Sequence, residues 1–224
     1  MSAAPEAEPS SFRLVATLTI AGLVSGLLLV GAYQITKPII ERNEAEALQA
    51  AVFQVLPGTE ELQPLVLREG HLDPATPADK DAPTIYAGRR RGGALVGYAI
   101  PAQGPGFQDT IKLIFGYDPA RAVIVGMKVL DSRETPGLGD KIKKDKAFLD
   151  NFTALAVDPE IVPVGTGKKA APNELDCITG ATISSKAIAK IVNGGMETWR
   201  PVLVPEGLGA TEPEPPPVPQ EATP

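Results

Sequence analysis

The sequence predicts an α+β protein, with a single N-terminal transmembrane helix followed by an antiparallel-sheet domain that has flanking helices. An uncharged, apolar segment covers residues 14–36 and is long enough to cross a membrane. Between residues 84 and 130, short runs rich in β-branched residues are separated by brief turns. Such short links suit antiparallel strands, since parallel strands need much longer crossover connections. After residue 182, apolar residues recur at helical spacing.

Composition restricts the chemistry that this chain can carry. The 224 residues suffice for one ordinary domain with appendages, and the net charge of −6 argues against nucleic acid as a partner, which calls for a basic face. Cys177 is the only cysteine and His71 the only histidine. We therefore expect no disulfide, no iron–sulfur cluster, no attached haem and no Cys/His metal site. If the protein handles electrons, its carrier is organic.

The first element is the apolar segment, which contains 23 consecutive residues without a charge. At a rise of about 1.5 Å per residue, a helix of this length crosses a hydrocarbon core of about 30 Å. A cleaved signal peptide is the competing interpretation, but the segment is long for one and no clear small-x-small cleavage site follows. We predict a single-pass anchor in contact with membrane lipid at 14–36, preceded by a disordered tail at 1–13.

Two properties of the anchor stay open at the level of sequence. Gly22 and Gly26 form a strip that suits close helix packing, yet glycine is frequent in membrane helices in general. Arg13 precedes the span, while Lys37 and Arg42 follow it. The positive-inside rule therefore does not decide the orientation.

The segments around the sheet come next. Pro38 is tolerated in the first turn of a helix, so a second, amphipathic helix is expected over 37–58 as the connection to a domain at 59–204. Within that domain, residues 59–82 are polar and aperiodic, and predict no regular structure. Residues 205–224, with seven prolines and four glutamates, predict a disordered tail.

The predicted sheet is a meander of four strands. A helix, a short extra strand and a second helix are expected to follow it along the chain. Gly92-Gly93 suits a hairpin between the first two strands, and Asp118-Pro119 opens a type I turn between the last two. The expected strands cover 84–90, 94–100, 109–117, 122–130 and, briefly, 161–164. The expected helices cover 140–154, at the surface, and 182 to about 199.

Two glycine-rich loops interrupt this pattern, at 104–107 and 134–139. Neither is a dinucleotide-binding fingerprint, because the third glycine is missing and no strand–turn–helix unit surrounds them. As turns, they need no function.

The segment Asp176–Ser185 gathers small residues and hydroxyls at the start of the last helix. The first amides of a helix lack intrahelical partners and lie at the positive end of the helix dipole, which favours a phosphate. An ordinary N-cap explains the same residue types, because serine and threonine oxygens satisfy those amides. The residue types alone do not separate these two interpretations.

Two motifs in this order resemble a known family. Asp176-x-x-Thr179-Gly180-Ala181-Thr182 resembles the recognition motif that bacterial flavin transferases read in their substrate proteins, where they attach FMN through its phosphate to the last threonine. The loop Glu134–Gly139 resembles the other signature of such FMN-binding domains. From about residue 14 to 201, the chain is similar to the G subunit of the Rnf electron transport complex and, next, to the C subunit of the sodium-translocating NADH:quinone reductase.

The resemblance implies an FMN-binding domain with FMN joined by a phosphoester to Thr182, which is then a substrate of the transferase and not a catalytic residue. Thr179 and Ser185 would donate to phosphate oxygens, residues 134–139 would line the flavin ring, and Phe107 would stack on it. The implied cofactor-binding residues are Thr182, Thr179, Gly180, Ala181, Ser185, Glu134, Thr135, Gly137, Leu138, Gly139 and Phe107.

The function implied by the resemblance is electron transfer within an ion-translocating oxidoreductase, without an independent catalytic activity. The partners would be other membrane and redox subunits of an Rnf complex, with a flavin transferase for maturation. The location would be a bacterial inner membrane, with the FMN domain on the periplasmic side. A component like the C subunit of the quinone reductase is one alternative, and a non-redox membrane-anchored interaction domain is the other.

Overall fold

A computed structural model describes residues 11–79 and 82–203 of the chain. The predicted tail at 205–224 and most of the predicted tail at 1–13 lie outside these residues. The chain divides into two units, with the boundary between Leu48 and Gln49, and each unit is described by itself.

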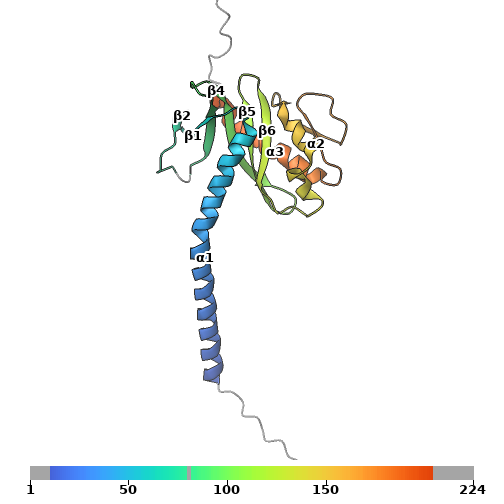
Figure 1. Ribbon diagram of the computed structural model, residues 1–224. Helices are drawn as coiled ribbons and strands as arrows, with labels where there is room; N and C mark the ends of the chain where they lie inside the picture. The colour runs from blue at the N-terminus through green and yellow to red at the C-terminus, as the bar shows by residue number, and fades with distance from the viewer. Residues whose placement is uncertain (1–10, 80–81, 204–224) are drawn as a thin grey trace, which may run out of the picture. The chain divides into compact units, whose positions relative to one another are not determined.

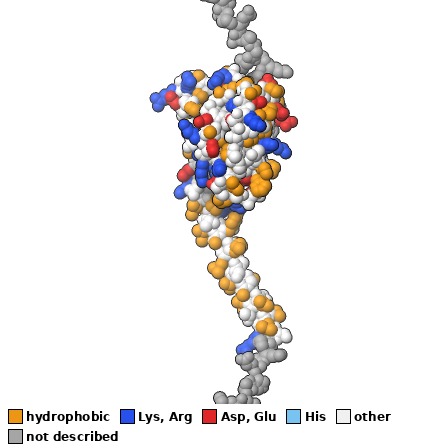
Figure 2. Space-filling view, turned by 90° about the vertical axis from the view of Figure 1, so that its right-hand side faces the viewer, with side chains coloured by type: hydrophobic (Ala, Val, Ile, Leu, Met, Phe, Trp, Pro, Cys, Tyr) orange, Lys and Arg blue, Asp and Glu red, His pale blue; other side chains and the backbone are white. Residues whose placement is uncertain are grey.

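The first unit is formed by most of helix α1, which spans Ser11–Val55 (Figure 1). Its side chains are exposed along almost the whole apolar segment, and Figure 2 shows hydrophobic side chains distributed along the helix. Within the described residues, α1 is the one helix that is long and apolar enough to cross a membrane.

The prediction of a separate helix beginning at Pro38 was wrong, because α1 continues through this proline. Pro38 has no N–H, so the carbonyl of Gln34 loses its usual helical partner. The loss is confined to one place, and long hydrogen-bonded segments on both sides keep the helix continuous. Just before the proline, the Thr36 hydroxyl donates to the carbonyls of Ala32 at 2.9 Å and Tyr33 at 3.3 Å, which adds hydrogen bonds there.

The second unit contains a seven-stranded antiparallel sheet in the order β2-β1-β3-β4-β5-β6-β7 (Figure 1). The predicted meander is confirmed, since β3 to β6 are consecutive neighbours. The strands of this sheet are β1 Glu61–Arg68, β2 His71–Pro74, β3 Thr84–Arg89, β4 Leu95–Pro105, β5 Thr110–Asp118, β6 Val123–Asp131 and β7 Leu155–Ala156. A separate parallel pair is formed by β8 Val162–Val164 and β9 Glu174–Asp176.

Strands β1 and β2 correct the prediction that residues 59–82 lack regular structure. The buried residues of β1 are the adjacent Leu65 and Val66, so the strand lacks the alternation that sequence reasoning looks for. The strand forms because β1 pairs with β3, with Leu65 opposite Ile85. Long-range pairing therefore decides the structure of this segment.

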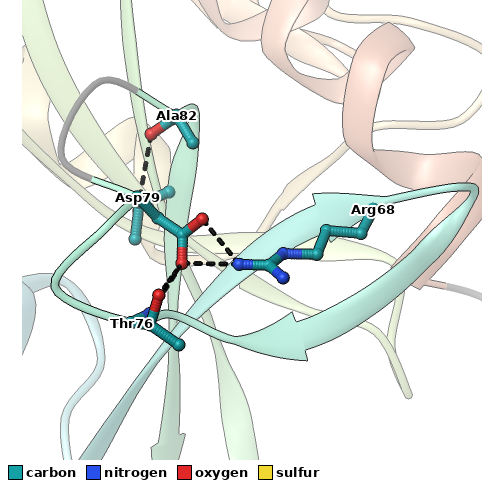
Figure 3. Close-up of polar contacts among 5 residues, drawn as sticks. Arg68, Thr76, Asp79 and Ala82 are labelled. Carbon is teal, nitrogen blue, oxygen red and sulfur yellow. Dashed lines mark hydrogen bonds and ion pairs between the residues drawn. The ribbon is translucent and has the colours of Figure 1, made fainter.

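A polar cluster ties the segment after β2 to β1 (Figure 3). The Arg68 guanidinium donates to both carboxylate oxygens of Asp79, at 2.6 and 2.8 Å. Asp79 also accepts from the amide and the hydroxyl of Thr76 at 2.7 and 2.6 Å. These hydrogen bonds, those from Thr76 first, lower the pKa of Asp79. The cluster closes a surface turn and involves no residue of the predicted site.

Short helices replace the single surface helix expected over 140–154. They are η1 Gly139–Lys143, α2 Lys146–Asp150 and η2 Asn151–Thr153. The Asp145 carboxylate accepts from the Phe148 amide at 3.0 Å and so begins a new helix in the middle of the segment.

The C-terminal helix α3, Thr182–Leu203, confirms the helix expected from residue 182. It packs against β4, and a Cβ at Gly195 would lie 3.0 Å from the Phe115 ring. A Cβ at the neighbouring Gly194 would meet nothing within 4 Å. Gly195 thus allows close helix–sheet packing, while Gly194 does not contribute to it.

The opposite face of the sheet receives the end of α1 and Leu56. Successive residues of a strand point to opposite faces, so Phe115 faces α3 while Gly116 faces the carbonyl of Val55. Four glycines lie under this segment, one on each strand from β3 to β6. We call this set the glycine seat; it consists of Gly88, Gly97, Gly116 and Gly126.

The glycine seat leaves room for backbone where side chains would otherwise stand. A Cβ at Gly116 would collide with the Val55 carbonyl oxygen. Gly126 is the residue paired with Gly116 on the adjacent strand β6, and a Cβ there would lie 2.8 Å from the same oxygen. A Cβ at Gly97 would lie 2.5 Å from the Tyr117 carbonyl oxygen on the neighbouring strand and 3.1 Å from the Leu56 side chain. Val55 and Leu56 are buried as a result.

Candidate functional site

Three chain segments that are far apart in sequence meet at the carboxylate of Glu134. Its Oε1 accepts from the backbone amides of Phe107 at 2.9 Å and Gln108 at 3.1 Å. Its Oε2 accepts from the Ser184 hydroxyl in the first turn of α3. Glu134 is only 5% exposed, so its contacts are internal ones. The structure thus brings together the two glycine-rich loops and the motif at the start of α3.

Two glycines allow this meeting. A Cβ at Gly106 would collide with Oε1 of Glu134, and one at Gly139 would lie 2.8 Å from Oε2 and 2.9 Å from the Ser184 hydroxyl. These positions require glycine because the carboxylate occupies the space that a side chain would need.

Ser185 holds the turn at the start of α3 through two hydrogen bonds of its hydroxyl to the backbone. Its hydroxyl accepts from the Ile178 amide at 3.1 Å and donates to the Ala181 carbonyl at 2.9 Å, and the residue is fully buried. The expected role of Ser185 as a phosphate donor is therefore wrong, because its only proton is already committed. Ser185 instead holds the turn that leads into the helix.

Thr182 lies where the motif and the helix meet. It is the first residue of α3 and is exposed, as are Thr179 and Gly180 before it, whereas Ala181 is buried in the core. Gly180 has φ +81°, a left-handed conformation that favours glycine. A Cβ there would meet only Leu138, at 3.7 Å, which places the loop 134–139 next to the motif.

The hydroxyl of Thr179 pairs with that of Thr166 at 2.9 Å, and the Thr166 hydroxyl lies 2.5 Å from the Cys177 carbonyl, to which it donates. Both threonines line a cavity of about 260 Å³ beside the motif, together with Asp176 and Lys141. Sequence reasoning did not identify Thr166, which lies 13 residues before Thr179 and shares no motif with it.

The loop 134–139 is held by its own backbone. The Thr135 carbonyl accepts from the amides of Leu138 at 3.2 Å and Asp140 at 3.3 Å, and Gly137, with φ +77°, donates to the Asp140 carboxylate at 2.7 Å. Lys144 donates to the same carboxylate at 2.9 Å, and this hydrogen bond is the main reason that the pKa of Asp140 is lowered. The loop therefore has a defined shape.

Three apolar side chains stand exposed on the three segments. They are Phe107 at 61%, Leu138 at 50% and Ile183 at 58% exposure. Exposed apolar side chains on segments that meet are candidates for a binding surface. We call these three side chains the apolar rim. Ile183 was missed by sequence reasoning, although its position directly after Thr182 and away from the buried stripe of α3 could have indicated it.

Cys177 lies inside the motif, but its environment disfavours reactivity. It is 2% exposed, and desolvation raises the pKa of its thiol despite the opposing charge of Lys186. At neutral pH the thiol therefore stays protonated, and the thiolate is the reactive form.

Slow alkylation of Cys177 is the expected outcome. Because both burial and the raised pKa lower the amount of accessible thiolate, iodoacetamide at neutral pH should modify the folded protein much more slowly than the protein in denaturant. Raising the pH should accelerate the reaction with the folded protein. Mass spectrometry of the single cysteine measures both rates, and equal rates with and without denaturant would contradict this prediction.

Known proteins resemble this chain in sequence and in fold. Residues 106–197 match the family model described as FMN-binding domain. The chain is 29% identical over 202 residues to the G subunit of the Na(+)-translocating ferredoxin:NAD(+) oxidoreductase complex of Acetobacterium woodii, covering 84% of this chain and 91% of that protein. It is 31% identical over 182 residues to the G subunit of the ion-translocating oxidoreductase complex of Cereibacter sphaeroides, covering 80% of each.

Solved structures show the same fold. NqrC of Shewanella oneidensis matches with a TM-score of 0.57 at 16% identity, over 70% of this chain and 96% of that one. The C subunit of the Na(+)-translocating NADH-quinone reductase from Parabacteroides distasonis matches with a TM-score of 0.55 at 18% identity, over 72% and 94%. At these identities the likeness concerns the fold alone, whereas the G subunits are similar in sequence along most of their length. The chain therefore belongs to the family formed by the G subunits of the ion-translocating oxidoreductase complexes.

Proposed function

We propose that this protein is a membrane-anchored electron-transfer subunit of an ion-translocating oxidoreductase, and that it carries FMN through a phosphoester on Thr182. The observation that carries the proposal is the position of Thr182, an exposed hydroxyl at the start of α3 among the three segments that meet at Glu134. A phosphoester forms there when Thr182 Oγ1 loses its proton and bonds to the phosphorus of an FMN phosphoryl group, while the bond from that phosphorus to the leaving group of the transferase's flavin donor breaks and the leaving group departs.

The residues around Thr182 fit a phosphate and a ring system. The first amides of α3 lack intrahelical partners, and the helix dipole favours a negative charge beside them. Lys186 is exposed and follows Thr182 by one helical turn, on the same side of the helix, so its ammonium suits the phosphate charge. The apolar rim would contact the ring, and Gly180 leaves open space beside Leu138. Thr179 keeps its proposed place beside the phosphate, but to donate to it the Thr179 hydroxyl would have to give up its hydrogen bond to Thr166, whose own proton goes to the Cys177 carbonyl.

The chain's own part in electron transfer is to hold the cofactor. FMN, when bound, accepts electrons and passes them on one at a time. The described residues of the site include a threonine to attach it, an apolar rim and a helix start. The hydroxyl that meets a carboxylate there, Ser184 on Glu134, is buried and not open to a substrate. We therefore propose a relay between neighbouring redox subunits, with ion translocation as a property of the assembled complex and with a flavin transferase as the maturation partner.

The proposed location is a bacterial inner membrane, with α1 as a single-pass anchor and the FMN domain on the periplasmic side. The length and apolar composition of α1 support the anchor. The names of the similar subunits support the complex. The periplasmic side is proposed on the family likeness, since the charges that flank the apolar segment do not decide the orientation.

Expression with and without a flavin transferase tests the proposal. With the transferase, the wild-type band should fluoresce after denaturing electrophoresis, and its mass should rise by one FMN less one water. Without the transferase, the band should stay dark and the mass unchanged. A wild-type protein that stays dark and unmodified in the transferase-positive host would favour the non-redox interaction domain instead.

A further inference from the structure

We infer that Glu134 is a positioning residue, which docks the loop 106–108 onto the start of α3 and so gives the apolar rim its shape. The resemblance assigned Glu134 to the lining of the flavin ring. Its carboxylate is instead buried and engaged with the protein itself. The inference rests on the proposed function only in naming FMN as the ligand of this site.

The Glu134 carboxylate connects the loop 106–108 to the start of α3, two segments that are far apart in the sequence. Phe107 lies 27 residues before Glu134 in sequence, and Ser184 lies 50 residues after it. Each segment supplies at least one donor, so that both carboxylate oxygens are occupied. Arg133, next to Glu134, forms an ion pair at 3.7 Å with Asp109, next to Gln108. This pair is exposed, and exposed ion pairs contribute little to stability.

Burial makes these hydrogen bonds necessary. Among residues 11–79 and 82–203, no ion pair within 4 Å includes Glu134, so hydrogen bonds are the direct contacts that replace the water around its carboxylate. A buried carboxylate without a cation is tolerated only when donors satisfy its oxygens. Two amides and one hydroxyl do so here, and Gly106 and Gly139 let the backbone approach closely enough.

The groups that donate to Glu134 belong to, or lie next to, residues of the apolar rim. Phe107 carries one side chain of the apolar rim and also donates its amide to Glu134. Ile183 carries another and directly precedes Ser184, the hydroxyl donor. Glu134 therefore sets the distance between Phe107 and the start of α3, without touching the ligand.

Amide hydrogen exchange in the full-length protein without flavin tests the docking directly. Glu134→Ala should accelerate exchange of the Phe107 and Gln108 amides by about 10- to 100-fold, which converts to about 1.4–2.7 kcal/mol and lies within the usual cost of a lost buried partner. Glu134→Gln should preserve most of the protection, because its amide oxygen still accepts from both backbone amides. If Glu134→Ala does not fold, Ser184→Ala, which keeps the carboxylate, should accelerate the same amides by a smaller factor.

Asp118→Ala is the matched control. The Asp118 carboxylate also accepts from two backbone amides, those of Ala120 at 3.0 Å and Arg121 at 3.3 Å, but in the turn between β5 and β6. Its loss should accelerate only the amides of that turn. Unchanged exchange of Phe107 and Gln108 in Glu134→Ala, or equal losses in Glu134→Ala and Glu134→Gln, would overturn the inference.

A second readout concerns the flavin and separates positioning from general stability. In protein loaded by the transferase, Glu134→Ala should raise the quenching of flavin fluorescence by iodide, while Glu134→Gln and Asp118→Ala should match the wild type. Unchanged quenching in Glu134→Ala would overturn the link to the apolar rim. If the wild type itself takes up no flavin, the proposed function fails, but the exchange experiment still decides whether Glu134 docks the loop.

Discussion

Thr182→Ala is expected to abolish covalent flavin attachment completely. The proposed ester uses Thr182 Oγ1, and alanine has no oxygen at this position. Neighbouring hydroxyls do not replace it, since that of Ser185 is buried in two backbone hydrogen bonds and that of Ser184 is buried against Glu134. In a transferase-positive host, the variant should therefore give neither a fluorescent band after denaturing electrophoresis nor a rise in mass.

Thr198→Ala provides the control for this prediction. Thr198 is another exposed threonine on α3, whose hydroxyl donates to the Gly194 carbonyl at 3.0 Å. Its replacement should leave attachment at the wild-type level, because it lies about four turns along the helix from Thr182. Persisting fluorescence in Thr182→Ala would refute the phosphoester at this position, and mass spectrometry of peptides would then identify the residue that carries the flavin.

Gly116→Val is expected to destabilise the domain strongly. A Cβ at Gly116 collides with the Val55 carbonyl oxygen, and this obstacle is backbone that cannot rotate away. Overpacking of a buried site costs about 1–3 kcal/mol and more when backbone must move. Denaturant unfolding of the full-length protein in detergent, followed by fluorescence of the single tryptophan, Trp199, measures the change.

Gly194→Ala is the matched control for the glycine seat. Gly194 lies in α3 with nothing within 4 Å of its missing side chain. Alanine there should leave stability unchanged or raise it by about 0.5–1 kcal/mol, the usual gain for replacing glycine inside a helix. Equal losses in Gly116→Val and Gly194→Ala would show that close backbone approach at the glycine seat is not what stabilises this end of α1.

Elements with a strong local pattern were predictable from sequence. The apolar segment of α1, the alternating strands of the meander and the apolar stripe of α3 each carry a periodicity that is set by their own geometry. Elements that depend on distant partners were not. Strand β1 has no alternation and exists because it pairs with β3, and the helix through Pro38 persists because the segments on both sides are long.

The candidate site divides in the same way. The motif that begins at Asp176 and the loop that begins at Glu134 were identified as a pair by their resemblance to a known family, because each is short and contiguous, and the comparisons place the chain in that family. Sequence by itself thus determined that these two segments belong to one predicted site. Only the tertiary structure decided that Thr182 is exposed while Glu134 and Ser185 are buried and hydrogen-bonded within the protein. The hydrogen-bond partners of Glu134 lie 26 to 50 residues away along the chain, so the sequence around Glu134 cannot predict them.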